Sequence, residues 1–199
     1  AMDKVVMDIP FGMKMGDLEH IGYTGLRARE WLDSLVCREA EPLLMATAID
    51  SLGEKGRFVV IVPPNFLFKQ TKSLSVFREK IVKKGLLKAV VSLPPVHASS
   101  SVRSSMLVIE KTNNDVLFVD ATSLIQRERR NDAYISKENK DLLKDILENK
   151  KEVKGVSFLV PDTKVLEVGD WTFTQYLENE DTEQVRSLKD INTELKQAY

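Results

Sequence analysis

The stretch that decides the fold lies at residues 3–12, which read DKVVMDIPFG. Its apolar run, residues 5–7, is too short for a helix and is typical of a buried strand. Pro10 has no N–H group to donate to a neighbouring strand, and Gly12 permits a sharp change of direction, so the strand should end near Asp8. The stretch therefore predicts a strand that leads directly into a loop able to carry function.

Three groups that can bind a ligand come together where this strand ends. In an open α/β sheet, ligands bind at the carboxyl ends of the parallel strands. There Asp8 would offer acceptor oxygens, Pro10 a carbonyl oxygen, and Phe11 a flat apolar face. These groups suit a flat base that carries an exocyclic amine. The alternative interpretation is a strand-to-loop junction with an ordinary turn and no binding site.

The length and composition are those of an ordinary globular protein. The chain has 199 residues, of which 43% are hydrophobic, and this is enough for one well-buried domain or for one domain with an extension. Its formal net charge of -1 argues against broad, non-specific binding of nucleic acid. Any contact with DNA must therefore be local.

Cysteine and histidine are scarce in the chain. The one cysteine, Cys37, permits no internal disulfide and no cysteine zinc cluster, and His20 and His97 are too far apart to suggest a metal site. We therefore expect a cytoplasmic protein that holds no metal. No apolar run approaches the roughly 20 residues that cross a bilayer, so we also expect no membrane segment.

The chain beyond residue 12 predicts alternating helices and strands. Residues 13–25 and 65–68 are expected to be loops. The regular elements expected are a helix over residues 27–36, a helix from Pro42 to a cap at Gly53, a strand over 57–62, a helix over 73–83, and strands over 87–93, 104–110 and 116–119. The strand at 57–62 reads RFVVIV, and its lack of alternation is typical of a parallel sheet covered on both faces.

Two polar segments offer candidate contacts to DNA. Residues 97–105 form a serine-rich loop, in which Ser101 and Arg103 could touch phosphate oxygens, or which could be a solvated connection. Farther along, Arg127, Arg129 and Arg130 form a basic cluster. The cluster could approach phosphate, but such clusters are more often solvated faces.

The last third of the chain predicts two helices and an edge strand. Ser136 is expected to cap a helix that runs to about Lys150, with a buried leucine and isoleucine stripe. Residues 156–160 form the expected edge strand. Residues 181–199 place apolar side chains three and four positions apart, which is typical of an amphipathic helix.

The sequence DIPF at residues 8–11 resembles motif IV of the amino-methylating DNA methyltransferases, usually written Asp/Asn/Ser-Pro-Pro-Tyr/Phe/Trp. Ile9 stands in the place of the first proline, which bears on the rigidity of the loop more than on its chemistry. Later stretches resemble type I modification subunits in the same order along the chain, namely GRFVVIVPPNFLF at 56–68, KAVVSLP at 88–94, VRSSMLVIEK at 102–111, VLFVDA at 116–121 and the closing segment at 165–177.

The resemblance implies a fold and a division of the chain. The fold would be α/β, the C-terminal half of a Rossmann-like class I methyltransferase sheet, mostly parallel with an antiparallel hairpin strand and followed by a helical C-terminal extension. Residues 1–125 would form the target-base half of the methyltransferase domain. Residues 126–180 would form a charged helix and closing segment, and residues 181–199 an amphipathic tail helix.

The resemblance also implies a function for the parent protein. This would be an adenine-specific DNA methyltransferase of a restriction-modification system that uses S-adenosylmethionine. The side chain of Asp8 and the carbonyl of Pro10 would accept hydrogen bonds from the amine of a flipped adenine, while Phe11 would stack on its ring. The implied partners are DNA, a specificity subunit or target-recognition domain, and a second copy of the chain.

One expected motif is absent from the chain. The family holds its methyl donor mainly through a glycine-rich loop after the first strand of the sheet, and no Gly-x-Gly sequence occurs here. We therefore expect the isolated chain to be inactive. The alternative is a non-catalytic, methylase-like module that binds a specificity subunit or itself. A nucleotide-dependent dehydrogenase is disfavoured because its pyrophosphate-binding fingerprint is missing.

Overall fold

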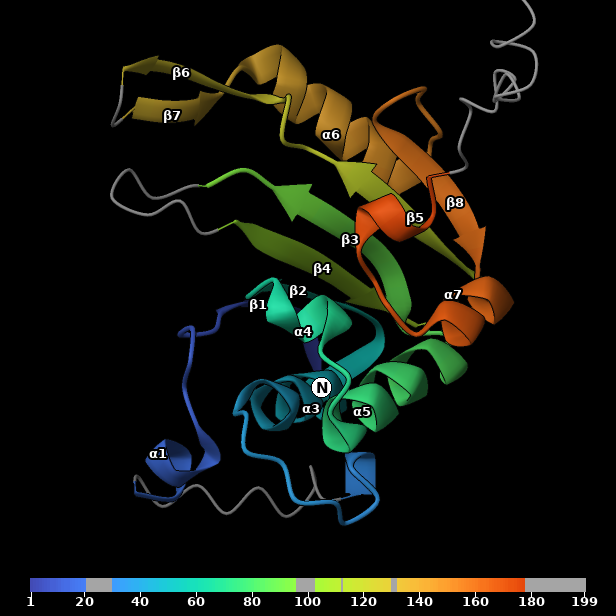
Figure 1. Cartoon of the computed structure of the whole chain (residues 1–199). Coiled ribbons are helices and arrows are strands. Elements are labelled where there is room, and N and C mark those ends of the chain that lie inside the picture. Colours follow the sequence, from blue (N-terminus) through green and yellow to red (C-terminus); the bar gives the residue numbers. More distant parts are fainter. Residues whose placement is uncertain (21–29, 96–102, 112, 130–131, 178–199) are drawn as a thin grey trace, which may run out of the picture.

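The computed structural model describes residues 1–20, 30–95, 103–111, 113–129 and 132–177, which fold around a six-stranded sheet (Figure 1). Across this sheet the strands lie in the order β1 (Met2–Asp8), β2 (Leu52–Val62), β4 (Ser104–Glu110), β3 (Leu87–Leu93), β5 (Asp115–Asp120) and β8 (Ser157–Pro161). A separate hairpin pairs β6 (Ile125–Arg129) with β7 (Asp132–Ile135).

The described helices are α1 (Met15–His20), α3 (Glu41–Ser51), α4 (Asn65–Phe68), α5 (Lys72–Lys83), α6 (Lys137–Asn149) and α7 (Asp162–Val168), with a short 3-10 helix η1 (Phe173–Gln175) near the end. Crossover helices α3 and α5 connect β1 to β2 and β2 to β3. Figure 1 shows these two helices on one side of the sheet and α6 on the other. The sheet is therefore covered on both faces, as the apolar run of β2 predicted.

The strand directions confirm the predicted type of sheet. β1 is parallel to β2, and β3 is parallel to β5. β4 lies between β2 and β3 and is antiparallel to both, and β8 is antiparallel to β5. Thus β1, β2, β3 and β5 all run in one direction, and β4 is the antiparallel strand of a hairpin with β3. The sheet is mostly parallel with an antiparallel hairpin strand.

Alternate side chains of the strands enter two hydrophobic cores. Phe58 and Phe118 lie in the larger core, which includes Phe77 of α5. Val108 lies in the smaller core with Ile146 of α6. Because successive residues of a strand point to opposite faces, β3, β4 and β5 contribute to both cores.

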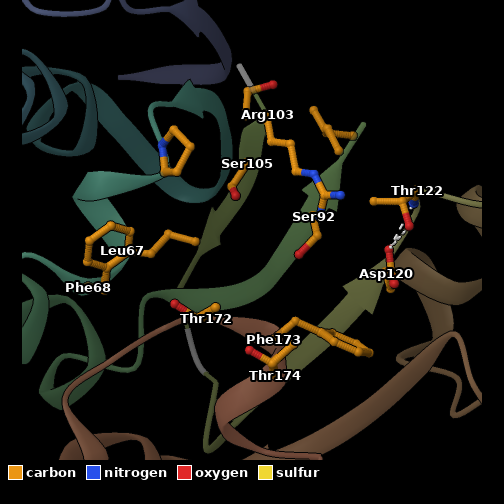
Figure 2. Close-up of a pocket in the computed structure, with 13 residues that line it drawn as sticks. Leu67, Phe68, Ser92, Arg103, Ser105, Asp120, Thr122, Thr172, Phe173 and Thr174 are labelled. Carbon is orange, nitrogen blue, oxygen red and sulfur yellow. Dashed lines mark hydrogen bonds between the residues drawn. The ribbon is translucent and has the colours of Figure 1, made fainter. Parts of the chain in front are cut away.

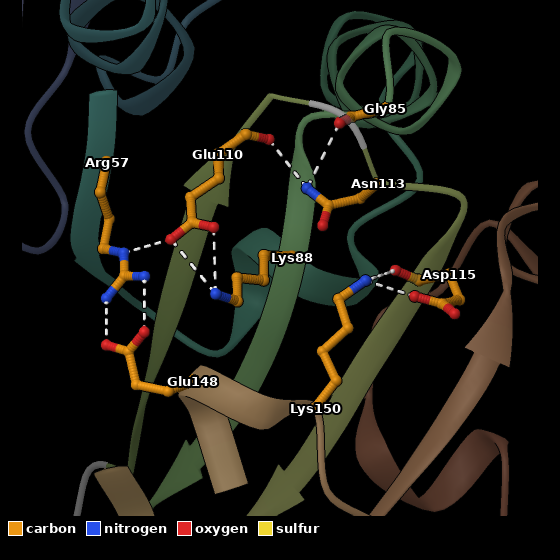
Figure 3. Close-up of polar contacts among 8 residues, drawn as sticks. All are labelled: Arg57, Gly85, Lys88, Glu110, Asn113, Asp115, Glu148 and Lys150. Carbon is orange, nitrogen blue, oxygen red and sulfur yellow. Dashed lines mark hydrogen bonds and ion pairs between the residues drawn. The ribbon is translucent and has the colours of Figure 1, made fainter. Parts of the chain in front are cut away.

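Ion pairs hold α6 against the sheet (Figure 3). Arg57 of β2 donates through both Nη atoms to the Glu148 carboxylate, at 2.7 and 3.2 Å, and also pairs with Glu110 of β4. Lys88 of β3 pairs with the same Glu110 at 3.0 Å, and its side chain is only 8% exposed. Hydrogen bonding to Glu148 is the main cause that raises the pKa of Arg57. Glu110 is thus the shared counter-ion of two cations.

Several predicted elements are confirmed. β3 and β4 have the predicted bounds, α5 begins one residue before the predicted helix, and β8 occupies the place of the predicted edge strand. α6 begins as predicted, because Ser136 Oγ accepts a hydrogen bond from the N–H of Asn139 at 3.2 Å. Gly85, with φ +61°, ends the turn after α5.

The predicted cap at Gly53 is wrong. Helix α3 does carry Pro42 in its first turn, but the chain then enters β2 at Leu52, well before the predicted start of that strand. A Cβ atom on Gly56 would lie 2.7 Å from the carbonyl oxygen of Met2. Gly56 therefore allows β1 and β2 to approach closely, and Gly53 lies within β2 instead of ending a helix.

The two predicted loops contain short helices. The described part of residues 13–25 includes α1, where the Asp17 carboxylate accepts a hydrogen bond from the N–H of Lys14 at 2.9 Å. Residues 65–68 form the single turn α4, directly after the prolines that end β2. Both helices were missed because each is too short to show an apolar period.

The predicted helix over residues 27–36 is also wrong at its end. Residues 27–29 lie outside the described part of the chain, and the helix has ended by Trp31. Asp33 and Ser34 have φ values of +50° and +59°, a left-handed conformation that cannot continue a helix. Neither residue is a glycine, so this turn could not be predicted from the sequence.

The C-terminal part of the chain contains elements that were not predicted, namely the β6–β7 hairpin, α7 and η1. Arg127 and Arg129 of the basic cluster lie on β6, in the hairpin that precedes α6. The predicted tail helix over residues 181–199 lies outside the described part of the chain. The division of the chain at residues 125 and 180 stays a prediction.

Candidate functional site

The loop after β1 is anchored by one buried side chain. Ile9 is 1% exposed, and its N–H donates to the carbonyl of Ile61 on β2 at 3.5 Å. Asp8, Pro10 and Phe11 on either side of it face solvent, and Phe11 is 45% exposed. The isoleucine that stands in place of a proline thus fixes the start of the loop by burial instead of by ring rigidity.

A tight turn follows Phe11. The N–H of Met13 donates to the carbonyl of Pro10 at 3.3 Å, and Gly12 has φ +80°, which favours glycine. A carbonyl oxygen has two lone pairs, so Pro10 can still accept a hydrogen bond from a ligand. Farther on, the N–H of Met15 donates to the carbonyl of Arg38 at 2.9 Å and ties the loop to the segment before α3.

A cluster of ionisable side chains lies where α3 begins. Glu41 is 4% exposed, and burial raises its pKa. Burial also opposes ionisation of Glu39, but hydrogen bonding from Lys69 helps to lower its pKa overall. Burial raises the pKa of Cys37, whose Sγ donates to the Glu39 carbonyl at 3.4 Å. The cluster therefore combines Glu39, whose pKa is lowered, with Glu41, whose pKa is raised.

A cavity of about 180 Å³ opens at the same end of the sheet as Asp8 (Figure 2). It lies where β3 and β5 end and β4 begins, between α4 and residues 172–174. Arg103 and Asp120 are its charged lining residues. The cavity thus lies at the carboxyl ends of parallel strands, the position where open α/β sheets bind ligands.

The structure describes only part of the predicted DNA-binding set. Arg103 is exposed just before β4 and lines the cavity. Arg127 and Arg129 lie on β6, which follows the carboxyl end of β5, but their side chains are outside the described part of the structure. Ser101 and Arg130 also lie outside it. The described structure therefore does not place these residues on one surface.

The described residues contain neither a metal-binding cluster nor a membrane-spanning helix. No group of three or more His, Cys, Asp or Glu side chains there is arranged to hold a metal ion. None of the helices in that part of the chain is long and apolar enough to cross a membrane.

The family profile described as N-6 DNA Methylase matches residues 1–184. The chain belongs to the N-6 DNA methylase family. The match includes β1 with its DIPF loop and every strand of the six-stranded sheet. The resemblance inferred from the sequence is thereby confirmed.

Solved structures of restriction-modification proteins share the fold of this member of the N-6 DNA methylase family. The type I methyltransferase subunit from Streptococcus thermophilus superposes with a TM-score of 0.76 at 16% identity, over 87% of this chain and 37% of that one. A structure from a study of complex assembly in the type I system gives 0.64 at 18% identity, over 98% of this chain and 42% of that one. The modification subunit of a putative type I enzyme from Vibrio vulnificus gives 0.60 at 18% identity, over 82% and 34%.

The chain therefore spans less than half the length of each of these proteins. At these identities the structural likeness shows the fold alone.

The DIPF loop was predicted from the sequence, whereas the cavity was not. The cavity has no contiguous motif, because Ser92, Asp120 and Thr172 come from segments far apart in the chain. One signal was available, since Ser92 is the next-to-last residue of β3 and Asp120 the last of β5, and polar side chains at the carboxyl ends of neighbouring parallel strands meet at one edge.

Proposed function

We propose that this chain is the target-base part of an S-adenosylmethionine-dependent DNA adenine-N6 methyltransferase from a restriction-modification system. The observation that carries the proposal is the exposure of Asp8, Pro10 and Phe11 together at the carboxyl end of β1, in a chain of the N-6 DNA methylase family. Residues 1–125 would form the target-base half, and the later segments would close it and contact partners.

The exposed loop offers what a flipped adenine needs. Extruding a base from duplex DNA costs a few kcal/mol, and stacking on the ring of Phe11 would return about 1–3 kcal/mol. The Asp8 carboxylate and the free lone pair of the Pro10 carbonyl would accept the two hydrogens of the exocyclic amine. These bonds orient the amine nitrogen and stabilise positive charge that develops on it, so the gain in rate comes from positioning and electrostatics.

The methyl donor does not fit a site within this chain alone. In the described residues, β1 is followed by the DIPF loop and β2 by Pro63 and Pro64, and no glycine-rich loop follows a parallel strand that could cradle S-adenosylmethionine. We therefore assign donor binding to another part of the parent protein. The chain's own contribution is to bind and orient the base.

DNA and a specificity subunit or target-recognition domain are the proposed partners. Arg103, exposed beside the cavity, would contact a phosphate, as would Ser101 in the same loop. Further phosphate contacts would come from the basic cluster of Arg127, Arg129 and Arg130. Such contacts would position the strand without reading its sequence.

A second candidate function is a non-catalytic module that associates through β1. This strand is at the edge of the described sheet, and Val6 on it is 81% exposed. An exposed edge with an apolar side chain favours pairing with another chain.

The test is site-directed substitution in the full-length gene product. We expect Asp8→Ala and Phe11→Ala each to lower methylation of DNA, on the order of 100-fold for the residue that orients the amine, while the folded state is retained because both side chains are exposed. Asp3→Ala, at the other end of β1, is the matched control and should be neutral. Unchanged methylation in both variants would assign the DIPF stretch to an ordinary turn.

A further inference from the structure

The cavity beside β3 and β5 has both apolar and polar walls. Phe68 of α4 lines it and is 47% exposed, so its ring offers a free stacking face. Figure 2 shows the Arg103 side chain extending from the start of β4 toward Ser92 at the end of β3. Across the cavity, Thr122 donates through its N–H and its hydroxyl to Asp120 Oδ1, at 2.9 and 2.5 Å. The Asp120 carboxylate is thus held in place through Oδ1, and no described residue bonds its second oxygen.

Two lining groups lack a partner in the described part of the chain. Ser104 is 4% exposed, and its Oγ is buried without a hydrogen bond there. Arg103 makes no ion pair with a described carboxylate. A buried hydroxyl without a partner costs free energy that a bound ligand would recover. These groups therefore point to a ligand with polar edges and negative charge.

The walls of the cavity are fixed before any ligand binds. Arg78 is 1% exposed and donates to the carbonyls of Phe66, Lys69 and Gly169, at 2.9, 3.0 and 3.2 Å. The N–H of Trp171 donates to the carbonyl of Leu67 at 3.0 Å. These bonds join α4 to the segment that leads into η1, and both contribute lining residues of the cavity. Such a preorganised site loses little conformational entropy on binding.

The cavity is separate from the DIPF loop. Between β1 and β3 lie β2 and β4, so the ends of β1 and β3 are three strand spacings apart. At about 4.8 Å per spacing this is roughly 14 Å. A single base that touches Asp8 cannot also reach Ser92 and Asp120 on the far wall of the cavity.

We infer that this cavity takes a second, unstacked nucleotide of the DNA strand, with its base against Phe68 and its phosphate on Arg103. The hydroxyl of Ser104 and the free oxygen of Asp120 would bond the polar edge of the base. The inference rests on the proposed function for the identity of the strand. It adds a second base-holding site on the same end of the sheet.

The experiment is amide chemical-shift mapping on the 199-residue chain. The probes are a deoxyadenosine trinucleotide, the same trinucleotide lacking its central base, and inorganic phosphate. We expect the complete trinucleotide to shift the amides of Ser92, Thr122 and Thr172. Equal shifts with the abasic probe or with phosphate would overturn the inference, and so would the absence of shifts at these amides.

Three substitutions sharpen the test. Arg103→Gln should weaken binding about tenfold, and Ser104→Ala several-fold, because each removes a hydrogen bond to the ligand. Thr174→Trp should abolish binding, since Thr174 is an exposed lining residue and a bulky ring there blocks the cavity without disturbing the core. Lys55→Gln, an exposed cation at the amino end of β2, is the matched control. Full binding by Thr174→Trp would overturn the inference.

Failure of this inference and failure of the proposed function give different results. Shifts confined to Phe11 and Gly12 would overturn the second site and leave the methylase proposal intact. Shifts at the cavity, in a protein whose full-length form methylates DNA equally well after Asp8→Ala, would support the cavity and remove the proposed role of the DIPF loop.

Discussion

Glu41 and Ser104 each bury a side-chain oxygen without a hydrogen-bond partner in the described part of the chain. Leaving such a group unpaired costs about 1–3 kcal/mol. Neither residue stands out in the sequence, because its burial is decided by segments that come from elsewhere in the chain. By contrast, the exposure of Asp8 and Phe11 at a strand end was predictable from the local pattern of apolar residues, proline and glycine.

Replacing Glu41 with glutamine should stabilise the protein, and increasingly so as the pH rises. Burial raises the Glu41 pKa in the folded protein above its unfolded value. Between the two values the folded state binds more protons, so the stability of the wild type falls as the pH rises through that interval. Urea unfolding between about pH 4 and about pH 8 should show the difference in unfolding free energy growing with pH.

The charges of Glu39 and Lys69 also act on the pKa of Glu41, and a substitution of Glu39 serves as the control. The charge of Glu39 raises the Glu41 pKa, whereas Lys69 lowers it. Since the pKa of Glu39 itself is lowered, Glu39→Gln should remove stability that is present near neutral pH and lost as the pH falls. A pH-independent effect of Glu41→Gln would contradict the raised pKa of Glu41.

At the scale of elements, the sequence predicts best what local patterns determine. The bounds of β3 and β4 and the Ser136 cap of α6 follow from apolar runs and a capping side chain. The start of β2 could not be predicted in this way, because Gly56 is needed for the close approach of β1, which the local sequence does not reveal. The position of α6 on the sheet depends on ion pairs between residues about 90 positions apart, such as Arg57 and Glu148.

Glu110→Gln should weaken the attachment of α6 to the sheet. It removes the shared counter-ion of Arg57 and Lys88, and Lys88 has little access to water. We expect a loss of about 1–3 kcal/mol in unfolding free energy, measured in urea so that added salt does not screen the pairs. Glu148→Gln, with a side chain 44% exposed, should cost less than about 1 kcal/mol. An equal loss in both variants would show that burial of Lys88 does not decide the energy.

At the scale of the whole molecule, β1 lies at one edge of the described sheet, and the site loop follows it. Of the candidate site, the sequence predicts the loop after β1 but not the cavity. The loop after β1 is local in sequence, whereas the cavity requires the order of the strands, which places the ends of β3 and β5 together.

We expect the chain to associate with itself through β1. Its unpaired edge and the exposed Val6 favour pairing between copies. Light scattering over a concentration series should show a mass that rises with concentration. Val6→Lys places a charge on the edge and should return the chain to a monomer. A strict monomer in the wild type, with Val5 and Val6 amides already protected from exchange, would contradict this prediction.

The isolated chain should bind S-adenosylmethionine weakly or not at all, and it should not methylate DNA. The reason is the absence of a glycine-rich loop after any described parallel strand. Calorimetric titration measures this directly. One-to-one binding in the micromolar range would show that this chain carries the donor site, and would contradict its assignment to the target-base part.

Arg78 has a consequence for how the chain is made. Synthesis proceeds from the N-terminus, and domains begin to fold as they emerge. Arg78 is synthesised 91 residues before Gly169, whose carbonyl completes its hydrogen bonding. Until that carbonyl arrives, and Trp171 with it, the guanidinium and the ring of Phe66 lack their cover from the closing segment. Early folding intermediates on the ribosome therefore keep this part of the core open to water until all six strands of the described sheet have been made.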